Sequence, residues 1–244
     1  MGRFCYCSKL LPGKANQVRA HWKNKANNES PDVLKAEEDF WKYLQMVGFE
    51  SWLQPTIQGD YLIHCLEGAS LSQIFKSLRE QISVKNRIAL QLRDFYLEVL
   101  GKDYSFPEVE PKLQHLLDIS LPTKTQTQYI KRGFFFPLLR EKEADHIRFK
   151  KEAMGKKRER HEESMQAFGV SHLSSWIQTT EQGKYLITYT ERHKHTPDTS
   201  EARLQQAVHS SAWEEISSVL MDHTGLKLSE LSPDVEWLTD QPVH

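Results

Sequence analysis

The chain has 244 residues, of which 39% are hydrophobic and 27% are charged, values that are ordinary for a folded globular protein. The formal net charge of −1 argues against a large nucleic-acid-binding surface, which needs an excess of lysine and arginine. No apolar run approaches the roughly eighteen residues that a membrane-spanning helix needs, and no signal-peptide core follows Met1. We therefore expect a cytoplasmic protein that binds neither nucleic acid nor membrane.

The first predicted strand covers residues 3–11, and Pro12-Gly13-Lys14 turns the chain toward a helix. Cys5 and Cys7 share one face of that strand, and Cys65 lies in another predicted strand. A three-sulfur metal cluster is one interpretation of this pattern. Free cysteines more often behave as small buried hydrophobic residues. We expect buried free thiols, no bound metal and no other cofactor.

A helical region follows and is interrupted at 27–31, where Pro31 favours a new helix start. The equivalent helix of the second half, about 141–168, is strongly charged. An anion site there is one interpretation. Because glutamates alternate with the basic residues, a solvated helix face is the expected outcome. The basic residues are Lys150, Lys151, Lys156, Lys157, Arg158 and Arg160.

The clearest feature is a segment that occurs twice. Residues 51–67 and 175–191 agree at ten of seventeen positions without a gap, at a constant offset of 124. Each copy has two apolar-rich runs around a polar turn with a glycine, Gly59 or Gly183, a pattern typical of a β-hairpin. The sequence thus predicts a duplication.

After each hairpin the apolar residues recur at helical spacing, and the helices are predicted to stop at Gly101 and Gly225. Each half then ends in an extended segment, and Glu108–Asp118 aligns with Glu230–Asp240 without gaps. We predict a first repeat at 1–119, a polar linker at 120–128 and a second repeat at 129–244.

Each repeat follows the order β-α-β-β-α-β, which predicts an α+β fold: a tandem duplication of a ferredoxin-like unit with two antiparallel four-stranded sheets. Both helices of such a unit lie on one sheet face and leave the other face bare. We expect the two bare faces to pack against each other within one chain, so that a monomer closes the barrel. Higher oligomers are compatible with this arrangement.

Leu10-Leu11-Pro12-Gly13-Lys14 and the Trp-X-Gln…Gly-X-Tyr-Leu-Ile hairpin of each half resemble the dimeric α/β-barrel superfamily. The resemblance covers nearly the whole chain. It implies a ligand cavity between two ferredoxin-like sheets. Members include antibiotic-biosynthesis monooxygenases and muconolactone isomerases, so a cofactor-free oxygenase or isomerase is among the implied functions.

Fused repeats of similar length also resemble the chlorite dismutase group, which implies a haem ligand in the second repeat. The nearest candidates are Met154 with His161, or His146, but no continuous match to a haem motif surrounds His161. Haem binding is a minor alternative.

Two histidines are candidates for catalysis: His64, which could act as a base near a cavity, and His115. A core or rim position for His64 is the alternative. The predicted ligand pocket consists of residues retained in both repeats, for which packing is the alternative role. These residues are Trp52, Gln54, Tyr61, Trp176, Gln178 and Tyr185.

Two functions from different classes follow. The first is a barrel that binds a small apolar or aromatic molecule, with or without catalysis, which needs an inter-sheet cavity of about 300 Å³ or more. The second is a non-catalytic scaffold or interaction protein whose inter-sheet space is solidly packed.

Overall fold

The computed structural model describes residues 1–28, 30–122, 129–194, 211–227, 230–231, 233 and 235–242. These residues form two compact units. The first comprises Met1–Pro111 and Glu236–His244, and the second comprises Lys112–Val235. Residues 123–128 of the predicted linker lie outside the described residues.

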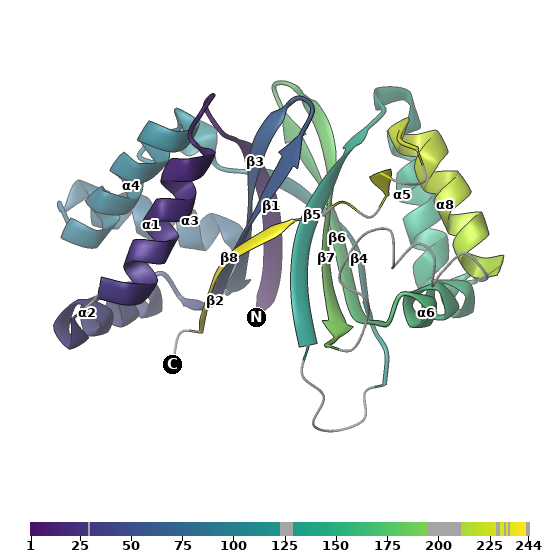
Figure 1. Ribbon diagram of the computed structural model, residues 1–244, viewed down its shortest axis with the longest axis horizontal. Helices are drawn as coiled ribbons and strands as arrows, with labels where there is room; N and C mark the ends of the chain where they lie inside the picture. The colour runs from purple at the N-terminus through teal and green to yellow at the C-terminus, as the bar shows by residue number, and fades with distance from the viewer. Residues whose placement is uncertain are drawn as a thin grey trace. The chain divides into compact units, whose positions relative to one another are not determined.

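The first unit has a four-stranded antiparallel sheet in the order β1-β3-β2-β8, with helices on one face (Figure 1). In chain order its elements are β1 (Gly2–Lys9), α1 (Ala15–Asn28), α2 (Pro31–Tyr43), β2 (Met46–Thr56), β3 (Gly59–Gly68), α3 (Leu71–Ser83), α4 (Arg87–Leu100), the short 3-10 helix Pro107–Val109 and β8 (Glu236–Pro242).

The second unit has a four-stranded antiparallel sheet in the order β4-β6-β7-β5, again with its helices on one face (Figure 1). Its elements are β4 (Lys112–Ser120), β5 (Tyr129–Leu138), the 3-10 helix Arg140–Lys142, α5 (Glu143–Met154), α6 (Arg158–Ala167), β6 (Val170–Thr180), β7 (Gly183–His193) and α8 (Ser211–Thr224). The predicted α+β class with two antiparallel four-stranded sheets is confirmed. Closure of the sheets into one barrel stays a prediction.

The duplicated segment forms the predicted hairpin in both units, β2–β3 and β6–β7. Thr56 Oγ1 accepts a hydrogen bond from Gln58 N and donates to the carbonyl oxygen of Gly59 at 2.7 Å. Thr180 makes the same two bonds to Gln182 and Gly183. Gly59 and Gly183 adopt φ of 117° and 131°, which side chains disfavour. Turn chemistry therefore explains why Thr and Gly recur at this turn, whereas Gln contributes only its backbone N–H.

The last strand of each repeat is exchanged between the sheets. β4, from the first repeat, pairs with β6, and β8, from the second repeat, pairs with β2. Trp237 lies opposite Trp52, and His115 lies opposite Trp176, so the two edges use equivalent registers. A ferredoxin-like repeat is expected to complete its own sheet with its last strand, and this pairing differs from that expectation. Because the two final strands are alike, as are β2 and β6, either edge can accept either strand.

One difference from the prediction appears in the helices. Gly155 divides the expected 141–168 helix into α5 and α6, with φ −114° and ψ −113°. Glycine adopts this backbone conformation more readily than other residues. Helices α4 and α8 stop just before Gly101 and Gly225, as predicted, and both glycines have positive φ. None of the helices in the described part of the chain combines the length and apolar character that a membrane crossing requires.

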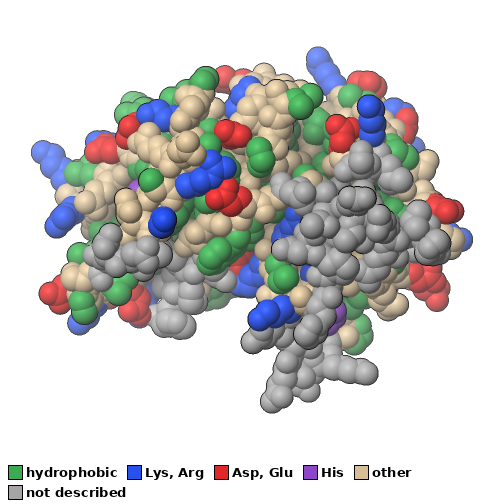
Figure 2. Space-filling model, in the orientation of Figure 1, with side chains coloured by type: hydrophobic (Ala, Val, Ile, Leu, Met, Phe, Trp, Pro, Cys, Tyr) green, Lys and Arg blue, Asp and Glu red, His purple; other side chains and the backbone are tan. Residues whose placement is uncertain are grey.

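The charged surface of α5 and α6 is largely solvated, as predicted. Arg158 pairs with Glu162, and both Lys157 and Arg160 pair with Glu215 of α8. On the face shown in Figure 2, lysines and arginines are interspersed with aspartates and glutamates. Such exposed pairs contribute little to stability. Lys150 is the exception to this solvated pattern, because it is buried.

Cys5 and Cys65 lie directly opposite each other on β1 and β3 and form a disulfide. The expectation of free thiols is therefore wrong for these two residues and correct for Cys7, which is buried and forms no disulfide. The register of β1 on β3 decides the difference, because it places Cys65 beside Cys5 rather than beside Cys7.

His64 lies in the core between the first sheet and its helices. Its ring is 5.3 Å from those of Phe49 and Tyr96 and 5.4 Å from that of Tyr6, and Ser51 Oγ lies 3.1 Å from its Nδ1. The side chain is fully buried. Burial, and secondarily the charge of Lys102, lowers the pKa of His64 to about 3.

The exchanged pairing predicts how a chain that ends at Val235, and so lacks β8, will behave. Hydrogen exchange of the β2 amides should accelerate relative to the full chain, because β2 loses a neighbour. The amides of β6 should stay protected, because β4 still covers that edge. Accelerated exchange in β6 with an unchanged β2 would show that β8 belongs to the sheet of its own repeat.

The buried His64 predicts acid sensitivity. Unfolded chains protonate histidine near pH 6.5, whereas folded His64 stays neutral down to a pKa of about 3. The unfolded state therefore binds more protons in this window, and His64 lowers the free energy of unfolding by up to about 1.4 kcal/mol per pH unit as the pH falls. The free energy of unfolding, measured by urea titration at several pH values between 7 and 4.5, should fall less steeply with pH for His64→Leu than for the parent chain. The same dependence on pH in both chains would contradict this.

Candidate functional site

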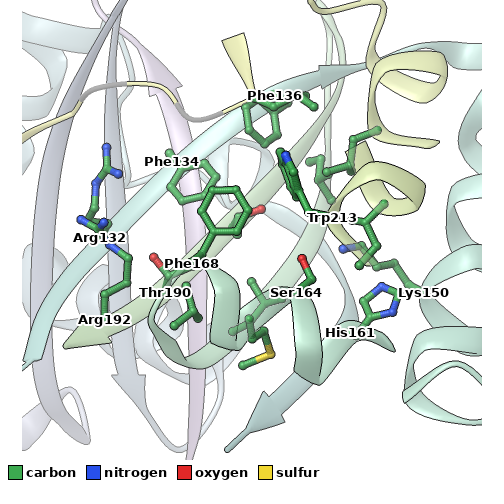
Figure 3. A pocket seen from close by; sticks show the side chains of 18 residues that line it. Arg132, Phe134, Phe136, Lys150, His161, Ser164, Phe168, Thr190, Arg192 and Trp213 are labelled. Atoms are coloured by element: carbon green, nitrogen blue, oxygen red, sulfur yellow. The ribbon is translucent and has the colours of Figure 1, made fainter. Parts of the chain in front are cut away.

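A cavity of about 130 Å³ lies within the second unit, between the sheet and helices α5, α6 and α8 (Figure 3). The strands β5, β6 and β7 supply one wall and the helices supply the other. Its volume is similar to that of an engineered cavity of about 150 Å³ that holds benzene. The space therefore suits a molecule of about one ring.

Shorter side chains in the second repeat help to make room for this cavity. His64 and Leu66 of β3 correspond to Thr188 and Thr190 of β7 at the offset of 124, and both threonines line the cavity. In the first unit, aromatic rings surround His64, and the corresponding space is only about 30 Å³. Divergence between the repeats has opened a space in one unit and filled it in the other.

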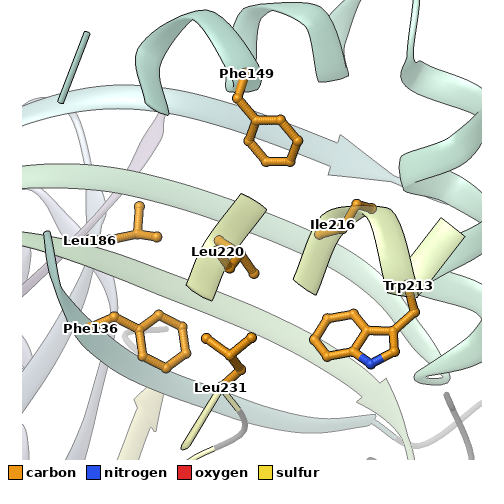
Figure 4. Close-up of a cluster of buried hydrophobic side chains, with 7 residues drawn as sticks. All are labelled: Phe136, Phe149, Leu186, Trp213, Ile216, Leu220 and Leu231. Carbon is orange, nitrogen blue, oxygen red and sulfur yellow. The ribbon is translucent and has the colours of Figure 1, made fainter. Parts of the chain in front are cut away.

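Much of the lining is aromatic or aliphatic. Phe136 and Leu186 from the sheet pack with residues of α8 in one buried cluster (Figure 4). Phe168 meets the indole of Trp213 edge to face, with ring centroids 4.4 Å apart. Such rings favour an apolar or aromatic ligand. The buried cluster comprises Phe136, Phe149, Leu186, Trp213, Ile216, Leu220 and Leu231.

Lys150 of α5 extends into this apolar space (Figure 3) and is 6% exposed. Among the described residues, none provides an ion-pair or hydrogen-bond partner for its ammonium group. The ammonium lies 5.6 Å from the centroid of the Phe149 ring. Burial lowers the pKa of Lys150 to about 8. The amine is therefore largely charged at pH 7 and easily deprotonated.

His161 and Ser164 of α6 line the same side of the cavity as Lys150 (Figure 3). His161 Nδ1 lies 3.3 Å from the carbonyl oxygen of Lys157, which fixes the proton on Nδ1. Its Nε2 is buried without a hydrogen-bond partner among the described groups. Burial first, and then the charge of Lys150, lowers the pKa of His161 to about 4. The ring is thus neutral at pH 7, and Nε2 is an acceptor.

Arg132 of β5 and Arg192 of β7 line the opposite side of the cavity (Figure 3). Both are buried, and Arg132 donates from Nη2 to the carbonyl oxygen of Pro233. None of the described residues that line the cavity is an aspartate or a glutamate. The described lining therefore carries three cationic side chains, counting Lys150, and no acidic one.

The six residues predicted to form a ligand pocket lie elsewhere. Phe49 of β2 contacts Trp22 and Trp41 on helices α1 and α2, so side chains that alternate with it, including Trp52, point away from the helices. The same alternation places all six on the helix-free faces of their sheets: Trp52, Gln54 and Tyr61 in the first unit, and Trp176, Gln178 and Tyr185 in the second. Their role as a ligand pocket stays a prediction.

The structure does not bring the two candidate catalytic histidines into the described cavity. His64 belongs to the first unit and faces its helices, whereas His115 is exposed on β4 of the second unit, with its ring 5.7 Å from that of Trp176. Their predicted catalytic roles are untested.

The residues near His161 do not fit haem. The cavity that His161 faces has the volume of about one ring, far below that of a tetrapyrrole. His146 is fully buried, and its Nδ1 lies 3.0 Å from Nδ1 of His223. Met154 is 41% exposed and lies outside the cavity. Among the described residues, no three histidine, cysteine or acidic side chains are grouped as a metal site.

The sequence does not single out Ser164, Arg132 or Arg192, and it offers Lys150 only as part of an anion site, the alternative to a solvated helix face. The signal that distinguishes Lys150 is weak: it shares the buried side of α5 with Phe149 and Ala153. Arg132 shares its face of β5 with Phe134 and Phe136, and Arg192 shares its face of β7 with Leu186 and Thr188. A charged residue on this helix-facing side is unusual.

No protein-family model matches the chain, and no curated protein matches it. Solved structures with a similar arrangement include a "putative monooxygenase" from Fusobacterium nucleatum (TM-score 0.49, 8% identity, covering 98% of this chain and 93% of the other). An anthrone oxidase-like protein has a TM-score of 0.47 and 9% sequence identity, covering 98% of this chain and 93% of the other. A "putative monooxygenase" from Lactobacillus acidophilus has a TM-score of 0.44 and 13% sequence identity, covering 98% of this chain and 94% of the other. At these scores and identities the likeness carries no argument about function.

Proposed function

We propose that the second unit binds a small, ring-sized molecule with an anionic oxygen group in the cavity between its sheet and its helices. The observation that carries this proposal is the buried ammonium of Lys150 in an apolar space. A charge in such surroundings is costly unless a group of opposite sign accompanies it. A bound carboxylate or phenolate would supply that group, while its ring would contact the aromatic lining.

The shape of the lining supports the orientation of the ligand. Phe134, Phe168 and Trp213 lie between the arginine side and the lysine side (Figure 3). A ring among these side chains can direct its anionic group toward Lys150, with Ser164 as a second donor. Its other end would then approach Arg132 and Arg192.

Catalysis by an oxygenase or isomerase that needs no cofactor is a second candidate. Removal of a proton from the bound molecule can start either reaction, and it needs a base. The neutral Nε2 of His161 is such a base, and the His161 side chain lines the cavity. Lys150 would stabilise the resulting anion. This assignment moves the catalytic role from His64 and His115 to His161.

A cytoplasmic location is part of the proposal and conflicts with one feature of the first unit. Disulfides such as Cys5–Cys65 persist mainly in oxidising compartments. The oxidation state of this pair in protein taken from the cell, measured by thiol labelling, distinguishes the compartments. The ligand-binding proposal concerns the second unit and is independent of that result.

Benzoate tests the binding proposal, because it combines one ring with one carboxylate. We expect binding to the parent chain in calorimetry, and Lys150→Met should weaken it at least about tenfold, the effect of losing a hydrogen bond to a charged group. The matched control is Lys151→Met, which removes the adjacent exposed lysine and should leave the affinity unchanged.

Two outcomes of the same titration at pH 7 would contradict the binding proposal. The parent chain could fail to bind benzoate at millimolar concentration, or Lys150→Met could bind it as tightly as the parent chain does. Either result would show that the buried amine does not recognise an anionic group in this cavity.

A further inference from the structure

We propose that Lys150 is a nucleophile that forms a reversible imine with a small aldehyde held in the cavity of the second unit. The inference rests on the proposed function, because the aldehyde would occupy the same cavity, and it adds ring-sized carbonyl compounds to the ligand class. Its basis is the placement of one primary amine, 6% exposed, in an aromatic cavity with a neutral histidine on the same side.

The surroundings of Lys150 favour an amine that reacts. Lysine attacks carbonyl carbon only as the neutral amine, and desolvation in an apolar pocket increases the neutral fraction. No carboxylate in the described part of the lining holds the ammonium form. Burial lowers the pKa of Lys150 to about 8, so part of the population is neutral near pH 7.5.

The reaction needs no oxidant, reductant or cofactor. The lone pair on Lys150 Nζ forms a bond to the carbonyl carbon, and the electron pair of the C=O π bond moves to oxygen. A proton passes from nitrogen to that oxygen and gives a carbinolamine. The nitrogen lone pair then forms the C=N bond while the C–O bond breaks, and the oxygen leaves as water with a second proton from nitrogen.

His161 is placed to carry these protons. It lines the cavity beside Lys150, burial lowers the pKa of its imidazole, and its Nε2 has no hydrogen-bond partner among the described residues. Nε2 can therefore accept a proton from the attacking nitrogen and return it to the oxygen. The hydroxyl of Ser164, on the same helix, can donate to the carbonyl oxygen.

The arginine side of the cavity suggests which aldehydes bind best. A ring that carries an aldehyde at one end and a carboxylate at the other can place the first group at Lys150 and the second near Arg132 and Arg192. We therefore expect 4-carboxybenzaldehyde to react at lower concentration than benzaldehyde does, because charge-assisted contacts add to burial of the ring.

Borohydride trapping tests the imine, because reduction converts C=N into a stable secondary amine. The full chain is incubated with 4-carboxybenzaldehyde at a molar concentration below that of the protein. The mixture is reduced and digested, and the modified lysines are located by mass spectrometry. We expect Lys150 to carry most of the adduct and the exposed Lys151 at least tenfold less. Excess benzoate should suppress the adduct at Lys150 alone.

Two variants separate this inference from the binding proposal. Lys150→Arg keeps a positive charge but has no primary amine, so it should bind benzoate and yield no adduct at this position. Lys150→Met should lose both properties. Equal labelling of Lys150 and Lys151 would overturn the imine and leave anion binding in place. Absence of benzoate binding together with selective labelling of Lys150 would overturn the anionic ligand and leave the nucleophile in place.

Discussion

The burial of one lysine ammonium in an apolar space is the constraint on which the candidate site depends. Transfer of a lone charge from water to such surroundings costs several kcal/mol, and proteins usually place an acid beside it or lower its pKa. Lys150 follows the second route, because its pKa falls to about 8 while no described residue pairs with it. A group retained at such a cost is a candidate for function.

The duplicated sequence explains where this site arose. Both units use the same hairpin, whose turn residues Thr, Gln and Gly make identical bonds. The helix-facing positions of the same strands were free to diverge. The first unit fills its core with His64 and surrounding rings, whereas the second has Thr188 and Thr190 there and a cavity. Retained positions thus maintain the hairpin, and changed positions create the site.

Much of the fold could be predicted from the sequence because local patterns determine it. The repeat, the hairpins and the helix stops at Gly101 and Gly225 follow from periodicity and turn chemistry. The exchange of β4 and β8 could not be predicted, since two similar strands fit two similar edges and only tertiary pairing decides. The disulfide was missed for the same reason, because it depends on the register of β1 on β3.

The candidate site was less predictable than the fold. Retention in both repeats predicts a pocket that includes Trp52 and Trp176, which lie on the helix-free sheet faces. The described cavity instead depends on residues that differ between the repeats. Lys150 occurs in a run of charged residues, and only the contact of α5 with its sheet and with α8 distinguishes it from Lys151. In a run of charged residues on a helix, composition alone therefore does not reveal the one that lies on the buried side.

The most direct test of the site is the pKa of the Lys150 amine, followed by NMR in protein with ¹³C-labelled lysine and assigned by comparison with Lys150→Met. A buried amine without an acidic partner predicts a titration midpoint near pH 8. A midpoint at about pH 10.4, the pKa of a lysine in water, would show that the amine is solvated or paired. That result would contradict both the anion site and the nucleophile.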